Sequence, residues 1–357
     1  MRFPVKQKKL VNQRYIKLIA MKRVHKIYDK IINLENIFSA WKNFQSGKAD
    51  KIAVQGFRHN LENNLFRLAE DLKNRRYRHG GYEKFIITDP KIRIINKAEA
   101  RDRIVHTLVA RELEEIYQPI FIVNSYACQQ GRGIHKALKD LIIMSRRQSE
   151  NNTKNFWFIK CDVRKFFDNI GHEELLLILQ NKIADNDFLR LLAEIIKSYS
   201  QAPGRGLPLG NYTSQWLANI YLNELDYFIK QELKIKHYLC YADDFVIMAE
   251  SRESLMANLA PIQEFLWQKL GLKTHEDKII VKKYSAGIDF VGYRVLPHYV
   301  VVRKRFAKRM LKNLDKTHLA WQAGEQSYRQ YYETINSYLG WLEHSAGHKL
   351  TNRVIYQ

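Results

Sequence analysis

The chain has 357 residues, enough to bury more than one hydrophobic core, and its 46% apolar and 12% aromatic content excludes a disordered protein. Its 59 Lys and Arg against 37 Asp and Glu give a formal net charge of +22, which indicates a polyanionic partner, either nucleic acid or an anionic membrane surface. The 20 tyrosines and 6 tryptophans favour nucleic acid, because aromatic rings offer stacking faces for bases.

Cysteine usage and hydropathy indicate a cytoplasmic protein. Cys128, Cys161 and Cys240 are far apart and form no Cys-x-x-Cys pair, which argues against a disulfide framework and against a zinc site. The most apolar part of the amino terminus, residues 16–21, is short and contains Lys17. We therefore expect neither a signal peptide nor a membrane span.

Residues 1–30 form a basic arm with ten Lys or Arg against a single acid, Asp29. Such an arm is typical of a solvated tail or of a nucleic-acid contact, and we favour contact with RNA. Residues 34–76 then show helical periodicity. Their leucines 61, 65, 68 and 72 recur at the spacing of a core-facing stripe, so we expect them to pack and to carry no chemistry.

Two glycines at 80–81 end this helical region and precede a predicted hairpin. Residues 82–87 and 91–95 read as strands joined by Thr-Asp-Pro. Lys91 and Arg93 are two residues apart and would share one face of the second strand. They form either a solvated sheet face or a pair of cations that neutralise a nucleotide triphosphate.

A helix is predicted over residues 100–116, where Arg103 is either a phosphate contact or a partner for Glu99. Residues 131–135, Gly-Arg-Gly-Ile-His, form a glycine-rich bend that opens the next helix. Bends of this kind let a backbone approach phosphate closely, although one Gly-x-Gly is weak evidence alone.

The next predicted strand, residues 156–163, carries Asp162 at its far end and is followed by Phe166 and Phe167. Two helices extend to Tyr199. Residues 204–210 contain three glycines and a proline, so they form an irregular loop, which leads into a core helix beginning at Ser214.

Residues 238–249 consist of two apolar runs that flank adjacent acids, and they predict a β-hairpin with Asp243 and Asp244 at its turn. Two acids at a turn, or one acid ending a strand, are by themselves ordinary turn and capping chemistry. Together with Asp162 they provide three carboxylates on rigid strands, a ligand set suited to Mg²⁺. Two such ions about 3.5–4 Å apart promote phosphoryl displacement, so on this basic chain the pattern predicts a nucleic-acid polymerase.

The carboxyl-terminal part begins with an amphipathic helix over 255–270 that Gly271 caps. Strands are predicted over 278–282, 288–295 and 300–302. A final group of helices opens with a one-sided basic stripe, which we expect to bind a nucleic-acid backbone. The stripe consists of Arg303, Lys304, Arg305, Lys308, Arg309, Lys312 and Lys316.

Three stretches, in this order, resemble motifs of one enzyme family. Asp162 with the following Phe-Phe-Asp is similar to the first catalytic motif, and residues 206–222 are similar to the lid over template and nucleotide with its helix. Residues 241–244, Tyr-Ala-Asp-Asp, are similar to the box that carries the other two metal ligands. Over residues 50–300 the chain therefore resembles reverse transcriptases of the bacterial, group II intron-like lineage.

This resemblance implies an α+β fold shaped as a right hand. A basic helical region, 1–50, would lead into fingers over 51–155 and a palm of antiparallel strands with packed helices over 156–300. A finger-like helical insertion over 172–200 would interrupt the palm, and 301–357 would form a short helical thumb.

Two departures from that lineage are similar to reverse transcriptases of diversity-generating retroelements. Leu209 stands where most relatives have Gln, and Ser214-Gln215 stands where most have Ser-Pro. Residues 125–127 with 131–135 resemble the same group. A lid Gln can hydrogen-bond the incoming nucleotide, whereas Leu209 offers only shape and dispersion, so we expect relaxed base selection.

The resemblance also implies roles for individual residues. Those implied for the two Mg²⁺ ions are Asp162, Val163, Asp243 and Asp244. Phe167 or its neighbour Phe166 would exclude a ribose 2′-hydroxyl. The nucleotide-binding set would further include Lys91, Arg93, Leu209, Gly210, Gln215 and Lys278, and Arg132 and Tyr241 would join the basic stripe in binding nucleic acid.

The implied function is RNA-directed DNA synthesis that is error-prone at template adenines. The implied partners are a template RNA, a primer or cDNA, dNTPs and a small accessory protein, with no membrane. Three alternatives stay open: a group II intron maturase, a retron or phage-defence reverse transcriptase, and a non-catalytic RNA-binding scaffold. Maturases usually carry further domains, whereas this sequence ends at Gln357 soon after the last predicted strand. The intact acids disfavour the scaffold.

Overall fold

The computed structural model describes residues 23–89 and 91–355, so most of the basic arm predicted to contact RNA lies outside the described residues. The chain divides into two compact units, each built from three segments. The first unit contains the chain up to residue 122 together with 164–225 and 264–273. The second contains 123–163, 226–263 and the chain from residue 274 onward.

The first unit is mainly helical, because its segments have the amphipathic periodicity that the sequence predicts. The leucine stripe of α5 is confirmed, with Leu65, Leu68 and Leu72 buried. The helices are α2 (Ile27–Ile31), α3 (Leu34–Gln45), α4 (Ile52–His59), α5 (Leu61–Lys73), α6 (Ala100–Tyr117), α8 (Phe166–Asn169), α9 (His172–Lys182), α10 (Asn186–Lys197) and most of α11 (Tyr212–Tyr227).

The predicted hairpin in this unit is confirmed as an antiparallel pair, β1 (Tyr82–Ile87) and β2 (Arg93–Ala98). The second strand begins two residues later than predicted, so Lys91 lies in the connecting turn and only Arg93 is in the strand. The shift follows from the register, in which Ile87 pairs with Arg93, so that Lys91 precedes the first paired residue of β2.

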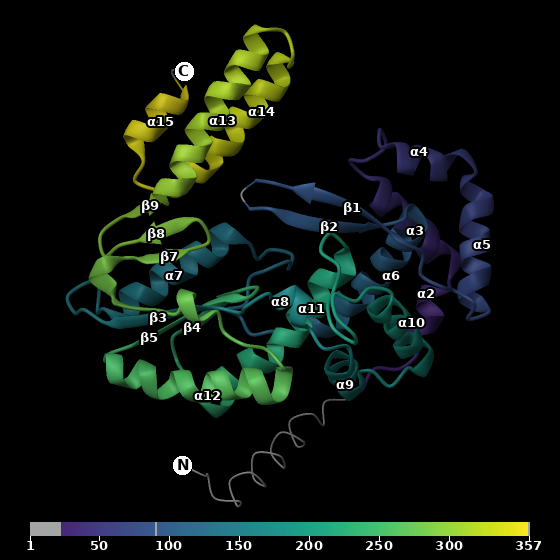
Figure 1. Cartoon of the computed structure of the whole chain (residues 1–357), viewed down its shortest axis with the longest axis horizontal. Helices are drawn as coiled ribbons and strands as arrows, with labels where there is room; N and C mark the ends of the chain where they lie inside the picture. The colour runs from purple at the N-terminus through teal and green to yellow at the C-terminus, as the bar shows by residue number, and fades with distance from the viewer. Residues whose placement is uncertain (1–22, 90, 356–357) are drawn as a thin grey trace, which may run out of the picture. The chain divides into compact units, whose positions relative to one another are not determined.

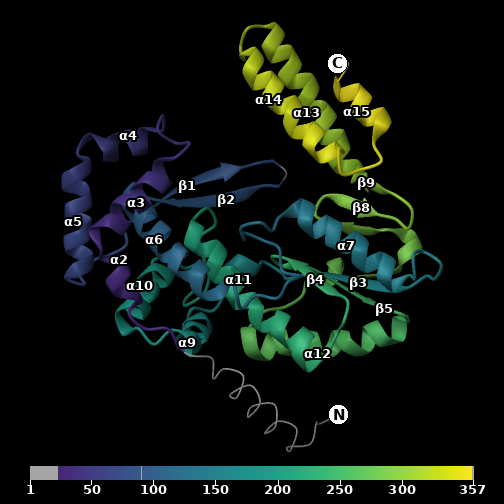
Figure 2. The same cartoon turned by 180° about the vertical axis from the view of Figure 1, so that it is seen from behind.

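The second unit is organised around a four-stranded antiparallel sheet in the order β4-β5-β3-β6. These strands are β3 (Trp157–Asp162), β4 (Tyr238–Tyr241), β5 (Asp244–Ala249) and β6 (Ile280–Lys283). Helix α7 (Ile134–Gln148) lies on one side of this sheet and α12 (Arg252–Leu270) on the other, as both views show (Figures 1 and 2).

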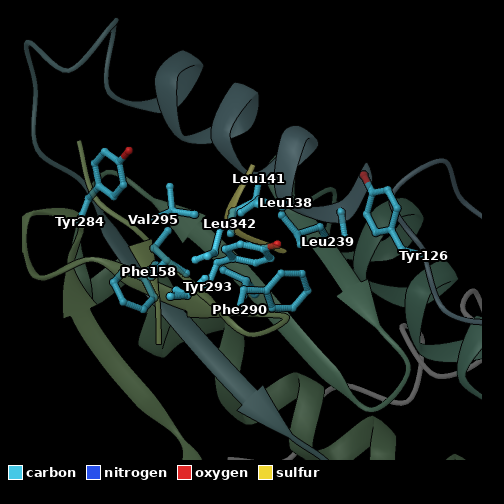
Figure 3. Close-up of a cluster of buried hydrophobic side chains, with 14 of the residues drawn as sticks. Tyr126, Leu138, Leu141, Phe158, Leu239, Tyr284, Phe290, Tyr293, Val295 and Leu342 are labelled. Atoms are coloured by element: carbon cyan, nitrogen blue, oxygen red, sulfur yellow. The ribbon is translucent and has the colours of Figure 1, made fainter. Parts of the chain in front are cut away.

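A second antiparallel sheet and three helices complete this unit. The sheet contains β7 (Ile288–Phe290), β8 (Tyr293–Val295) and β9 (Val300–Val302), and the helices are α13 (Lys304–Gln322), α14 (Tyr328–Leu342) and α15 (His348–Ile355). Figure 3 shows how buried side chains from α7, the larger sheet and the smaller sheet meet in one cluster, which includes Leu138, Phe158 and Phe290.

The prediction of one strand over residues 288–295 is wrong. Val291 and Gly292 have φ values of 41° and 91° and turn the chain, which splits the segment into β7 and β8. Gly292 is required there because a Cβ atom would lie 2.7 Å from the Trp341 ring. The strand predicted over 278–282 begins instead at Ile280, and Lys278 ends a short 3₁₀ turn (Glu276–Lys278).

The predicted glycine cap of α12 is confirmed. Gly271 has a φ of 59°, and the amide of Leu272 donates to the Leu266 carbonyl, which closes the helix end. Within the described residues, no helix combines the length and the apolar character that crossing a bilayer requires.

Candidate active site

The β3 and β5 strands bring two of the predicted acids together. In their antiparallel register Asp162 is directly opposite Asp244, on the face of the sheet shared with Phe158. The hairpin differs slightly from prediction, since its two turn residues are Ala242 and Asp243 and Asp244 is already the first residue of β5. Ala242 has a φ of 52°, as a tight two-residue hairpin turn requires.

Asp243 is held next to the other acids by its own backbone. Its carbonyl accepts a 3.1 Å hydrogen bond from the Val163 amide, one residue beyond β3. Burial, and then the nearby charge of Asp162, raise the pKa of Asp243 to about 6. Burial also raises the pKa of Asp244, against the opposing effect of Lys160. The three acids therefore form one electrostatically coupled group.

Two lysines neutralise part of this negative charge. Lys160 Nζ lies 2.7 Å from Asp244 Oδ2, and Lys278 Nζ lies 2.7 Å from Asp162 Oδ1. Lys278 was predicted from the family pattern to be near the nucleotide, and the structure places it on a carboxylate of the acid group. Lys160 was not predicted, although its position two residues before Asp162 on one strand was a usable signal.

The acids fit a divalent metal by their chemistry. Carboxylate oxygens are the ligands that Mg²⁺ prefers, and Asp244 Oδ1 is buried without a hydrogen-bond partner in the described structure. An oxygen in that condition is costly unless a cation or donor completes it. Within residues 23–89 and 91–355, no three His, Cys, Asp or Glu side chains are arranged as a metal-binding group. The carboxylates of Asp162 and Asp244 form ion pairs with Lys278 and Lys160 instead.

A buried polar network beneath the hairpin was also missed by the sequence reasoning. Asp226 is 3% exposed and accepts hydrogen bonds from the Tyr238 hydroxyl and from the Cys240 thiol, at 3.3 Å from Sγ. Burial raises the pKa of Asp226 to about 6. Because Tyr238 and Cys240 belong to β4, this network fixes the strand that leads directly to Asp243.

The lid residues, around Leu209 and Gly210, lie in the first unit and are hydrogen-bonded to β2. The Asn96 amide donates to the Leu209 carbonyl at 2.8 Å, and the Asn211 side-chain amide donates to the Asn96 carbonyl at 2.8 Å. Gly210 has a φ of 108°, and a Cβ there would lie 2.5 Å from Ile95 Cγ2. The glycine is therefore required by both backbone conformation and close approach.

Gly210 and Gln215 line a cleft of about 530 Å³ in this unit, together with the cations Lys48, Arg103 and Arg111. Arg103 stacks on the Phe44 ring at 4.7 Å and makes no ion pair with Glu99 in the described part of the chain. Burial lowers the pKa values of both Arg103 and Lys48. Three cations against one lining acid, Glu114, make this cleft electropositive, and only Arg103 and the lid were indicated by sequence patterns.

The two phenylalanines after Asp162 differ in exposure. Phe166 is 3% exposed and packs in the core, whereas Phe167 is half-buried, so Phe167 is the one able to face a ligand. Lys91 and Arg93 are both exposed, as a role in binding phosphate requires.

The basic stripe falls on α13 and immediately before it. Lys304, Arg305, Lys308, Lys312 and Lys316 are exposed, while Met310 and Leu314 are buried on the opposite face. Arg303 and Arg309 are half-buried, with Arg303 Nε 3.8 Å from an Asp289 oxygen and Arg309 5.4 Å from the Phe306 ring centre.

The remaining two predicted nucleic-acid contacts belong to the second unit. Arg132 is half-buried and its guanidinium donates to the Ser125 carbonyl at 3.2 Å. Tyr241 ends β4 and is half-buried. Both therefore keep some exposed surface.

Comparison with known proteins identifies the family. The family model described as reverse transcriptase (RNA-dependent DNA polymerase) matches residues 87–295, more than half of the chain. The protein belongs to this family, and its α+β fold is that of a right-hand polymerase.

Individual relatives include proteins of introns. The chain is 23% identical to the group II intron-encoded protein LtrA of Lactococcus lactis, over 81% of this chain and 60% of LtrA. It is 32% identical to an uncharacterized 91 kDa protein in the cob intron of Schizosaccharomyces pombe, over 42% of this chain and 20% of that protein. The chain thus spans less than two thirds of the length of these relatives.

Among solved structures, a telomerase from Candida tropicalis in complex with a fragment of telomeric RNA has a TM-score of 0.51 to this chain at 13% identity. The match covers 78% of this chain and 54% of the telomerase. At that identity the likeness supports the fold alone.

Proposed function

We propose that this protein is an RNA-directed DNA polymerase that copies a template RNA into cDNA. The observation that carries the proposal is the opposition of Asp162 and Asp244 in the β3–β5 register, with Asp243 in the adjoining turn, in a chain that belongs to the reverse transcriptase family. Two carboxylates on paired strands with a third in the adjoining tight turn meet the need of a phosphoryl-transfer site, because positioning and charge neutralisation supply most of the catalysis.

The acids would hold two Mg²⁺ ions with Val163 beside them, and the bound ions would activate the primer hydroxyl and neutralise developing charge. Lys91 and Arg93 would bind the triphosphate of a dNTP, with Lys278 near its leaving pyrophosphate. Phe167 would exclude a ribose 2′-hydroxyl, and Leu209, Gly210 and Gln215 would form the lid.

Two electropositive surfaces support nucleic-acid binding. The exposed cations of α13 form a one-sided stripe, and the cleft around Arg103 holds three cations. Phosphate neutralisation by such cations gives affinity that falls steeply with salt. Arg132 and Tyr241 complete the proposed set of contacts to template and primer.

Primer extension on a primed RNA template, with Mg²⁺ and dNTPs, tests the activity. The wild-type chain should extend the primer, and Asp243→Asn should abolish extension because it removes a metal ligand. Asp277→Asn is the matched control, since Asp277 is a 92% exposed acid close to Lys278 in sequence and should leave extension unchanged. Synthesis retained by Asp243→Asn would refute the site, and a wild type inactive on every primed template would favour the non-catalytic scaffold.

We further propose that the enzyme serves a diversity-generating retroelement and misincorporates opposite template adenines. The Leu209 side chain cannot form a hydrogen bond with the nucleotide. Ser214-Gln215 follows it in the sequence, a combination similar to that in reverse transcriptases of diversity-generating retroelements. In this role we expect the enzyme to bind a small accessory protein. Leu209→Gln should lower misincorporation at adenines relative to other template bases, and unchanged error rates would contradict the idea.

A second candidate is the reverse transcriptase of a group II intron. The similarity to LtrA over 81% of this chain favours it. The neighbouring DNA distinguishes the two candidates, because a near-repeat pair that differs mainly at adenines supports the retroelement, whereas flanking intron sequence supports the intron.

A further inference from the structure

Lys160 occupies a central position beside the acid group. It lies on β3 between β5 and β6, and its side chain is only 12% exposed. Alternate residues of a strand share one face, so Lys160 projects from the same face as Asp162. In the β3–β5 register Lys160 is opposite Val246, which makes Asp244 its diagonal neighbour, within reach of a long side chain.

The ion pair with Lys160 leaves the two oxygens of Asp244 in different surroundings. Lys160 Nζ lies 2.7 Å from Oδ2, whereas Oδ1 is buried and has no hydrogen-bond partner among the described residues. The Phe290 ring lies 5.9 Å from Nζ and restricts where the ammonium group can go. The lysine is therefore held on one oxygen while the other stays available.

We propose that Lys160 is a positioning residue, which binds Oδ2 of Asp244 and so presents Oδ1 to a divalent cation. The inference rests on the proposed function, since it takes Asp244 to be a metal ligand. Groups that hold a metal ligand by its second oxygen or nitrogen fix its orientation, and their loss typically lowers metal affinity about 10- to 100-fold.

Lys278 is a contrasting case in the same group of residues. It contacts Asp162 from a three-residue 3₁₀ turn, and its side chain is 39% exposed. A lysine in that setting is able to leave its carboxylate when a cation or nucleotide binds. Lys160 lies on a central strand beside the Phe290 ring, so we expect it to remain bound to Asp244 when a cation or nucleotide binds.

Mn²⁺ binding to the full chain without nucleic acid, followed by electron paramagnetic resonance, tests the proposal. Lys160→Met should weaken Mn²⁺ binding by about tenfold or more. Lys160→Arg should restore most of it, because a guanidinium can still bind Oδ2. Lys282→Met is the matched control, since Lys282 is an exposed lysine on β6 opposite Phe158 and should bind Mn²⁺ as the wild type does.

A thermal melt in EDTA establishes that each variant is folded, and Lys160→Gln replaces Lys160→Met if the methionine variant does not fold. Primer extension gives a second readout, in which the Mg²⁺ concentration for half-maximal rate should rise while KM for dNTP stays unchanged. Unchanged or tighter Mn²⁺ binding in a folded variant would overturn the proposal, because the lysine would then be neutral or a competitor. If instead the wild type neither binds Mn²⁺ nor extends a primer, the proposed function itself fails.

Discussion

Replacing Gly210 by alanine tests whether the lid loop depends on its close approach to β2. Gly210 has a φ of 108°, and an added Cβ would lie 2.5 Å from Ile95 Cγ2. An L-residue in that backbone region lowers the free energy of unfolding by about 1–3 kcal/mol. Overpacking a contact of this kind lowers it by about a further 1–3 kcal/mol. Because Ile95 is half-buried and can shift, we expect Gly210→Ala to destabilise the protein towards the lower end of about 2–6 kcal/mol.

A double-mutant cycle separates the two contributions. Ile95→Ala removes the Cγ2 atom, so adding it to Gly210→Ala should recover the steric part and leave only the backbone strain. We expect a favourable coupling of about 1–3 kcal/mol between the two substitutions. Free energies of unfolding from urea denaturation of the four proteins give this number directly. Additive effects would refute the steric argument, and a stable Gly210→Ala protein would refute both parts.

Two further predictions concern hydrogen-bonded acids of the scaffold. Burial raises the pKa of Asp226 from an ordinary 3.8 to about 6, so the folded state retains this proton where the unfolded chain has lost it. The stability that this retained proton contributes is lost as pH rises from about 4 to about 6. Over that range the free energy of unfolding of the wild type, relative to that of Asp226→Asn, should fall by about 3 kcal/mol. Parallel pH profiles of the two proteins in urea denaturation would contradict this prediction. The Asp185 carboxylate caps α10 by accepting from the amides of Asp187 and Phe188, and it also accepts from the amides of Ile27 and Tyr28. Asp185→Ala should therefore lower the free energy of unfolding by about 2–4 kcal/mol in the same assay, which is more than the loss of an ordinary helix cap costs. A loss below 1 kcal/mol or so would mean that these amides find water instead.

Elements whose cause is local were predictable from the sequence. The leucine stripe of α5 follows from helical periodicity, and the end of α12 follows from Gly271. The strands that carry Asp162 and Asp244 follow from two apolar runs of strand-forming residues. These features needed no knowledge of distant contacts.

The features that sequence reasoning missed depend on tertiary packing. Residues 288–295 are rich in strand-forming residues, but the Trp341 side chain occupies the space beside Gly292 and the chain turns there. The burial of Asp226 depends on its contacts with Tyr238 and Cys240, which lie on a different element. Spacing along β3 places Lys160 on the same face as Asp162, but its pairing with Asp244 in particular depends on the register of β3 against β5.

Rapid-quench incorporation of one dNTP on a primed RNA template, across a Mg²⁺ titration, reports directly on whether Asp162, Asp243 and Asp244 form the catalytic site. We expect a saturable, Mg²⁺-dependent rate for the wild type, no measurable incorporation for Asp162→Asn at any Mg²⁺ concentration, and an unchanged rate for Asp277→Asn. A rate for Asp162→Asn close to the wild-type rate would contradict the assignment of these carboxylates as the catalytic site.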